Sequence, residues 1–184
     1  MISRIRPARD SDAALLSAVE RSAARRFQMV PGLEWVATGS VLGEAVHLRC
    51  IRAGTCWVAV DEPDFPVGFL SAEAAAEREL HIHEMAVDEA FQGYGIGRAL
   101  LGVAIGWAAA HRFATLTLTT FHDVPWNAPF YSRIGFEVLG ASDLNERLSA
   151  LLRKEIEGGF AEGSRCAMRL SLNHQTNSPS RGLR

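Results

Sequence analysis

The sequence lacks the features that mark a membrane, secreted or nucleic-acid-binding protein. No stretch of its 184 residues approaches the roughly 18 to 20 consecutive apolar residues of a membrane helix, and the polar start MISRIRPARD has no apolar signal segment. The 19 Lys and Arg residues against 21 Asp and Glu residues give a formal net charge of -2, which is no basis for nucleic-acid binding. We therefore expect a cytoplasmic protein that acts on neither membranes nor nucleic acids.

Cysteine is scarce as well. The three cysteines, Cys50, Cys56 and Cys166, are odd in number and show no C-x-x-C spacing, so they fit neither a disulfide framework nor a zinc site. No local signature marks any of them as a nucleophile. They are predicted to be reduced thiols that pack as small apolar side chains.

Apolar residues, by contrast, are plentiful. They make up 48% of the chain and charged residues 22%, which is enough for a sizeable core and too little charge for a disordered chain. Neither an internal repeat nor a linker interrupts the pattern. Residues 1–172 are therefore predicted to form one domain, and the polar residues 173–184 a disordered tail.

The spacing of the apolar residues predicts the helices and strands. Alternation and β-branched residues predict strands at residues 2–6, 55–61, 67–71, 79–87, 115–120, 136–139 and 165–172. Repeats of three and four residues predict helices at residues 10–27, 41–53, 98–112, 126–134 and 143–158, the last capped by Asp143. This order of elements predicts an α/β fold in which helices flank a sheet.

A glycine-rich turn separates the strand at residues 79–87 from the helix that follows. The segment from Gln92 to Arg98 reads QGYGIGR, and the free N–H groups and positive end of the following helix converge on it. Its three glycines remove the Cβ atoms that would keep phosphate oxygens away. The spacing is neither G-x-G-x-x-G nor a Walker loop, so it indicates either another kind of pyrophosphate site or a tight strand-to-helix turn.

Two segments, in the order found here, resemble the motifs of one family. Q-x-x-G-x-G after a strand ending Met85-Ala86-Val87 resembles the acetyl-CoA signature of the GNAT superfamily of N-acetyltransferases. Downstream, the segment from Asn127 to Phe136, NAPFYSRIGF, is similar to a second motif of that family. The resemblance spans residues 1–172. It implies an α/β fold with a mixed, mostly antiparallel central sheet of about seven strands, flanked by helices and splayed between the strands at residues 79–87 and 115–120.

The resemblance also implies an activity and a cofactor. The chain would be an N-acetyltransferase that binds acetyl-CoA in the splayed gap and transfers the acetyl group directly to a primary amine. Backbone groups of Met85 and Val87 would pair with the pantetheine and the acetyl carbonyl. The implied cofactor-binding residues are Met85, Ala86, Val87, Gln92, Gly93, Tyr94, Gly95, Ile96, Gly97, Arg98, Asn127 and Tyr131.

Acetyl transfer needs one group that removes the ammonium proton and another that protonates the leaving thiolate. His81 and His83 lie two apart on one strand and so share a face, and the strand is similar to that of arylalkylamine N-acetyltransferases, where such a pair removes the proton. Glu84 should point to the opposite face unless a bulge re-aims it, and the resemblance assigns the acid to Tyr131. The alternative for the histidines is an exposed or hydrogen-bonded pair. Without a third ligand they predict no metal site.

The acceptor is predicted from an unusually apolar loop at residues 28–40. Met29, Leu33 and Trp35 would form one wall of a pocket for a small-molecule amine, with Glu20 or Glu34 available for its ammonium group. A homodimer contact or ordinary core packing explains the loop as well. Two other functions stay open. One is acetylation of a protein N-terminus or lysine, which would need an open groove in place of a closed wall, and the other is a non-catalytic acyl-CoA-binding module.

Overall fold

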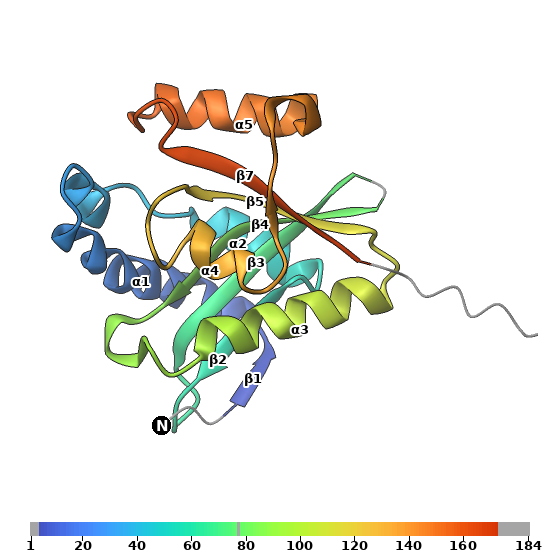
Figure 1. Ribbon diagram of the computed structural model, residues 1–184. Coiled ribbons are helices and arrows are strands. Elements are labelled where there is room, and N and C mark those ends of the chain that lie inside the picture. The colour runs from blue at the N-terminus through green and yellow to red at the C-terminus, as the bar shows by residue number, and fades with distance from the viewer. Residues whose placement is uncertain (1–3, 77, 173–184) are drawn as a thin grey trace, which may run out of the picture.

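A seven-stranded sheet with helices on both faces forms the centre of the protein (Figure 1). The computed structural model describes residues 4–76 and 78–172. In spatial order the strands are β1 (Arg4–Pro7), β2 (Cys56–Val60), β3 (Pro66–Ala76), β4 (Glu79–Val87), β5 (Thr115–Phe121), β7 (Arg165–Ser171) and β6 (Glu137–Val138). β4 and β5 pair in parallel and the other neighbours are antiparallel, which confirms the predicted mixed sheet.

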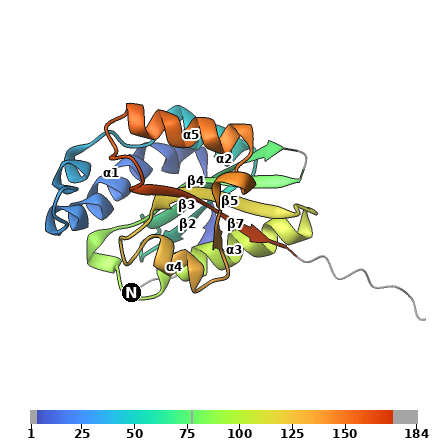
Figure 2. The ribbon, with the colours of Figure 1, turned by 45° about the horizontal axis from the view of Figure 1, so that its top comes forward.

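The helices divide between the two faces of the sheet. The α-helices of the described residues are α1 (Ala13–Ala24), α2 (Glu44–Arg52), α3 (Ile96–Ala110), α4 (Ala128–Ser132) and α5 (Glu146–Glu157). Figure 2 shows α1, α2 and α5 on one face, and α3 and α4 on the other. Short 3-10 helices are η1 (Asp10–Asp12), η2 (Arg25–Met29), η3 (Glu34–Thr38), η4 (Glu89–Phe91) and η5 (Ala141–Asp143).

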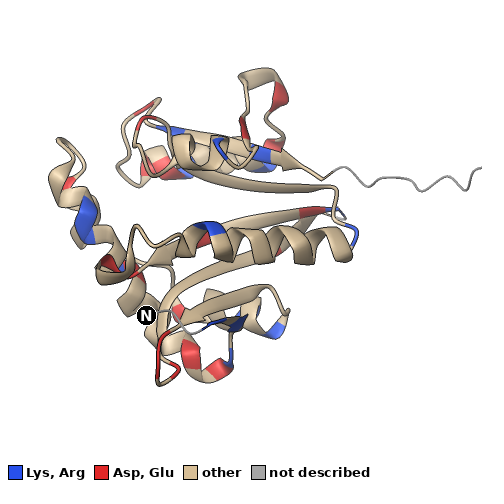
Figure 3. Cartoon of the chain, turned by 60° about the horizontal axis from the view of Figure 1, so that its bottom comes forward, with Lys and Arg blue, Asp and Glu red and all other residues tan. Residues whose placement is uncertain are grey.

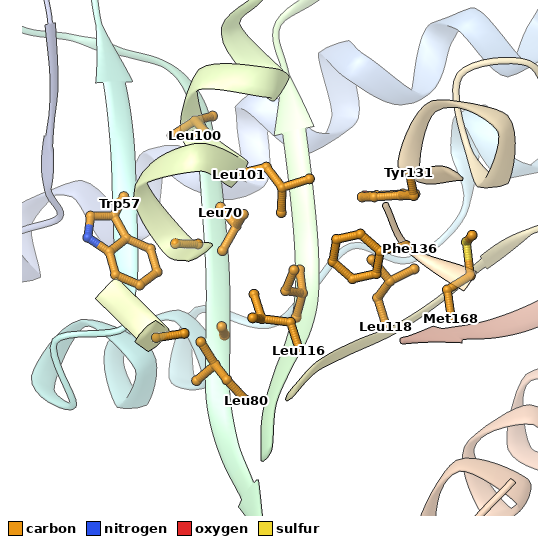
Figure 4. Packing of buried hydrophobic residues seen from close by; sticks show 14 of the residues in the cluster. Trp57, Leu70, Leu80, Leu100, Leu101, Leu116, Leu118, Tyr131, Phe136 and Met168 are labelled. Carbon is orange, nitrogen blue, oxygen red and sulfur yellow. The ribbon is translucent and has the colours of Figure 1, made fainter. Parts of the chain in front are cut away.

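Two hydrophobic cores lie on opposite faces of the sheet, and β2 contributes to both. All five residues of β2 are buried because Trp57 and Ala59 pack toward α3, whereas Val58 packs toward α1. Figure 4 shows the larger core, in which Leu100 and Leu101 of α3 pack with buried leucines of the strands. The three cysteines are free and buried, as predicted.

Some element boundaries differ from the sequence prediction. α1 ends at Ala24 and η2 follows, so Phe27 lies outside the α-helix that the spacing predicted. β3 continues to Ala76, beyond the five residues predicted. The cap of α5 is Asn145, whose side chain accepts the Leu148 N–H at 2.9 Å, and the prediction of Asp143 was wrong. The predicted tail at residues 173–184 lies outside the described residues.

β4 and β5 part early, as the family resemblance implied. Their parallel pairing covers only three residue pairs, from Glu79 with Thr115 to His81 with Thr117. β4 also contains a bulge. Ser71 of β3 pairs with Glu84 and Ala72 pairs with Ile82, so β4 carries one residue more than β3 between these two pairs. The remaining lengths of β4 and β5 therefore face each other without shared hydrogen bonds.

Charge of both signs is spread over the surface, and the long helix α3 carries little of it (Figure 3). Arg98 is its one charged residue among fifteen. Despite this composition, no helix within residues 4–76 and 78–172 combines the length and apolar character needed to cross a membrane.

Candidate active site

A cavity of about 630 Å³ lies where β4 and β5 diverge, a size common for small-molecule sites. Its walls come from α1, β4, the glycine turn, β5, α4 and the start of β7. Of the predicted cofactor-binding residues, those that line it are Met85, Ala86, Val87, Gln92, Gly93, Gly95, Ile96, Gly97, Arg98, Asn127 and Tyr131. Tyr94 is 76% exposed and is not among the lining residues.

The glycine turn lies in the wall of this cavity, at the N-terminus of α3. Gly93 and Gly95 have φ angles of 85° and 82°, a region that favours glycine, and Gly95 is the N-cap of α3. The first N–H groups of a helix have no acceptor within the helix, and the helix dipole adds positive potential at the same end. Because Gly93, Gly95 and Gly97 all line the cavity, an anion bound by the turn would lie inside it.

Asn127 is held at the cavity wall with one polar atom unsatisfied. Its Nδ2 donates to Thr120 Oγ1 at 2.8 Å. Its Oδ1 is buried and has no hydrogen-bond partner among the described residues. Buried polar atoms are almost always paired, so this oxygen is suited to accept an N–H from a ligand.

Side chains occupy the backbone groups at the free edge of β4. The Met85 N–H donates to Glu84 Oε1 at 3.1 Å, and Gln92 Nε2 donates to the Val87 carbonyl at 3.0 Å. These are the strand groups expected to pair with pantetheine. A ligand that pairs with this edge would therefore replace side-chain hydrogen bonds and would release the Glu84 carboxylate.

Two carboxyl groups share the cavity. Burial raises the pKa of Glu20 and of Glu84, and the charge of Glu20 raises the pKa of Glu84 further. Glu20 is positioned by the Leu42 N–H, which lies 3.1 and 3.0 Å from its two oxygens. Both groups are weaker acids than an ordinary Glu, which suits them to accept a proton near neutral pH.

The bulge in β4 explains why Glu84 reaches the cavity. Strand alternation placed Glu84 on the face opposite His83, away from the site. Because β4 carries one residue more than β3 at this point, the alternation is interrupted and both His83 and Glu84 line the main cavity. The sequence analysis identified Glu84 as a candidate, but the register between β3 and β4 that turns its side chain toward the cavity cannot be read from the sequence.

Tyr131 of α4 lines the cavity. Its side chain packs between the rings of Phe130 and Phe136, and the residue is 8% exposed. Burial raises the pKa of its phenol, and the charge of Glu84 raises it further. The phenol is therefore protonated at neutral pH and can donate a proton.

The two histidines occupy different positions relative to the cavity. Their rings lie 5.4 Å apart and both line a second cavity of about 230 Å³, so the prediction that they share a face is confirmed. His83 also lines the main cavity, and its Nε2 lies 2.9 Å from Glu73 Oε2. His81 is 4% exposed and does not line the main cavity, and burial lowers its pKa to about 3.

Hydrogen bonding determines which ring nitrogen of His81 carries the proton. Thr117 Oγ1 donates to Glu79 Oε1 at 2.7 Å and therefore cannot donate to the imidazole, whose Nδ1 lies 3.0 Å away. His81 Nδ1 is thus the donor to Thr117. Within the described residues, no group of three or more His, Cys, Asp or Glu side chains is arranged to hold a metal.

The acceptor side differs from the predicted wall. Glu20 lines the cavity, but Met29, Leu33 and Trp35 do not, and Met29 is 85% exposed. The 3-10 turns of the loop have no sustained period, so spacing did not indicate which side chains point inward. Trp35 packs instead against Phe160, at 5.0 Å between ring centroids.

Sequence reasoning also missed several residues that line this side. They are Phe27, Thr119, Phe121, Glu155, Phe160 and Arg165. They come from η2, β5, α5, the segment after α5 and β7, and no motif links them. Only the packing of these elements brings the residues together.

The comparisons with known proteins agree with this geometry. Residues 15–136 match the acetyltransferase (GNAT) family. A stretch of 90 residues is 31% identical to the peptidyl-lysine N-acetyltransferase YjaB of Escherichia coli (strain K12), and it covers 49% of this chain and 54% of that protein. A stretch of 92 residues is 34% identical to the N-acetylaspartate synthetase of Homo sapiens, covering 49% of this chain and 30% of that protein. The matches thus span about half or less of each relative.

A solved structure shares the fold over almost the whole chain. The PaiA N-acetyltransferase of Thermoplasma acidophilum, in complex with coenzyme A, superposes with a TM-score of 0.68 at 16% identity, over 94% of this chain and 99% of that chain. At this identity the likeness concerns the fold. The family match covers well over half of the chain and includes both the glycine turn and α4. This chain therefore belongs to the acetyltransferase (GNAT) family.

Proposed function

We propose that this chain is an acetyl-CoA-dependent N-acetyltransferase that transfers acetyl directly to the primary amine of a small molecule. One observation carries the proposal: a single cavity is lined by an anion-binding turn, an unsatisfied amide oxygen, a buried phenol and a buried carboxyl group. A module that only binds acyl-CoA has no need of the last two groups.

The residues at the cavity fit acetyl-CoA. Gly93, Gly95 and the first turn of α3 would hold the pyrophosphate, and Asn127 Oδ1 would accept an amide N–H of the pantetheine. The free edge of β4 would pair with the rest of the pantetheine. When bound, acetyl-CoA supplies a thioester carbonyl that an amine can attack.

Glu84 is the proposed base. It lines the main cavity, its pKa is raised, and its hydrogen bond to the Met85 N–H is one that an acetyl carbonyl would replace. The resemblance to arylalkylamine N-acetyltransferases favours the histidines instead. His81, however, is a weak base outside the main cavity, and His83 Nε2 is paired with Glu73. Glu84 combines access and basicity with a position beside the Met85 N–H, whereas Glu20, the other carboxyl group of the cavity, is held by the Leu42 N–H.

Tyr131 is the proposed acid. Its phenol stays protonated at neutral pH, whereas a thiol with a reference pKa near ~8.5 leaves as a thiolate that needs a proton. Met85 supplies the backbone N–H that would stabilise negative charge on the carbonyl oxygen. Removal of the ammonium proton and protonation of sulfur are thereby assigned to different walls of the cavity.

The rim of the cavity favours a small acceptor. The contact between Trp35 of η3 and Phe160, which precedes β7, joins two segments from opposite sides of the site. Phe27 makes a similar link to Phe121 and Trp126, at 5.1 and 5.7 Å. A groove that binds a peptide would need the segments joined by these contacts to be separated. The relatives' names cover both a protein lysine and a small molecule, and the joined rim is the observation that supports a small acceptor here.

The acceptor class is tested by measuring thiol release from acetyl-CoA over a panel of primary amines and peptides. We expect turnover with small amines and a kcat/KM at least about tenfold lower for peptides, because a joined rim excludes a polypeptide. Trp35→Ala should reduce this difference, whereas Met29→Ala, on the same loop but outside the contact, should not. Turnover of peptides alone would contradict a small-molecule acceptor.

Cofactor binding is tested with Gly97→Ala. An added Cβ has room in the protein, since its nearest neighbour, Met85 Cε, would lie 3.6 Å away. It would, however, face the cavity where the pyrophosphate approaches, so we expect roughly tenfold weaker coenzyme A binding by calorimetry. Gly106→Ala, on the same helix with open space around it, is the matched control. Equal affinity in both variants would rule out this mode of binding.

The acid is tested with Tyr131→Phe, which keeps the ring and removes the proton donor. We expect kcat to fall about 10- to 10⁴-fold with little change in coenzyme A affinity. The chain has two tyrosines, and Tyr94→Phe removes the other, exposed hydroxyl as a control. If Tyr131→Phe keeps wild-type turnover, the proton comes from another group.

The base is tested by the pH dependence of kcat/KM. Only the ionised carboxylate accepts a proton, so activity should rise with pH through a value well above the ~4.3 of an ordinary Glu. Glu84→Gln should abolish this rise with pH and lower kcat/KM by roughly 10²- to 10⁴-fold. Activity of this variant should recover at high pH, where the amine loses its proton near ~10 without help. His83→Gln should retain the rise of kcat/KM with pH. The opposite result for the two variants would return the role to the histidines.

A further inference from the structure

Arg165, the first residue of β7, places a guanidinium group in the main cavity. Its side chain is 15% exposed. Nε and Nη2 donate to the two carboxylate oxygens of Glu155 at 3.0 and 3.1 Å, and Thr119 donates to the same carboxylate at 2.6 Å. The rings of Phe121 and Phe160 lie 4.6 and 4.9 Å from Arg165 Cζ. The group is therefore held by both a charge pair and two aromatic rings.

This arrangement leaves one edge of the guanidinium without a partner. Arginine has five N–H donors in a fixed plane, and pairing through Nε and Nη2 uses one edge only. Nη1 makes no hydrogen bond within residues 4–76 and 78–172. The remaining edge, formed by Nη1 and the second hydrogen of Nη2, has the geometry that binds a carboxylate through two parallel hydrogen bonds.

The free edge is close to the reacting groups. Arg165, Glu84 and Tyr131 line the same cavity, and the charge of Arg165 lowers the pKa of both other groups. A partly desolvated ion pair costs free energy, and hydrophobic residues of similar size could fill the same space at less cost. A role in binding a ligand accounts for a charged pair at this position.

We propose that Arg165 binds a carboxylate of the acceptor, so that the acceptor is a primary amine of the amino-acid type. This inference rests on the proposed function and names its substrate class. The ammonium group would face Glu84 and Glu20, and the carboxylate would face Arg165, so the ligand carries no net charge into the cavity. Glu155 acts as a positioning residue, because it orients the guanidinium without touching the acceptor.

The test compares amino acids with their decarboxylated amines as acceptors. Phenylalanine is paired with 2-phenylethylamine, and leucine with 3-methylbutylamine, and thiol release gives kcat/KM for each. Wild-type protein should favour the amino acid of each pair by at least about tenfold. Arg165→Gln should lower kcat/KM for the amino acids by roughly 10- to 150-fold, mainly through KM, because a charged hydrogen-bonded partner is lost. For the amines the loss should be at least about tenfold smaller, because they carry no carboxylate for the guanidinium to bind.

Two further variants separate recognition from folding. Arg165→Lys keeps the positive charge but loses the paired donors, so it should retain the fold and only part of the preference. Arg153→Gln removes an exposed charge from α5 and should change nothing. Equal use of both members of each pair by the wild-type protein, or an equal loss for both in folded Arg165→Gln, would overturn the role of Arg165 while leaving acetyl transfer to small amines intact. Turnover of peptides but of neither member would instead overturn the proposed function.

Discussion

The early parting of β4 and β5 is the constraint on which the site depends. The two strands share only three residue pairs, and a polar cluster holds the closed end. Thr117 Oγ1 accepts hydrogen bonds from His81 and from Arg147 of α5, and donates one to Glu79. Beyond this point the two strands do not pair, and the Met85 N–H and the Val87 carbonyl bond to side chains that a ligand can replace. His81 thus serves the site by fixing where the gap begins.

α5 connects the closed end of the gap with its open end. Arg147, near its start, contacts Glu79 and Thr117, and Glu155, two turns later, holds Arg165 in the cavity. Eight residues of helix span about 12 Å, so one rigid element reaches both places. The segment after α5 then contributes Phe160 to the rim. A single helix between β6 and β7 therefore shapes the side of the cavity proposed for the acceptor, whereas β4, the glycine turn and α4 form the side proposed for the cofactor.

The parts of the structure that follow from local pattern were predictable. The bounds of β4 match the predicted residues 79–87, and α3 forms where the three- and four-residue spacing of apolar residues predicted a helix, because such periods can be read from consecutive residues. The bulge that turns Glu84 into the cavity depends on the register with β3, which no single strand encodes. Arg165 and Glu155 meet across a turn that carries no motif. Met29 was predicted inward only because it is apolar, and composition says nothing about direction in an irregular segment.

The raised pKa of Glu84 connects burial with the proposed chemistry. An alkyl ammonium with a pKa near ~10 and an ordinary Glu near ~4.3 differ by about 6 units, or about 8 kcal/mol, which proton transfer would have to supply before any bond forms. Burial of Glu84, and the neighbouring carboxyl group of Glu20, narrow this gap by about 1.4 kcal/mol for each unit of pKa. Arg165 acts in the opposite direction, and Glu155 neutralises part of its charge. The pair of Arg165 and Glu155 can thus offer a binding edge to an acceptor while preserving much of the basicity that the reaction needs.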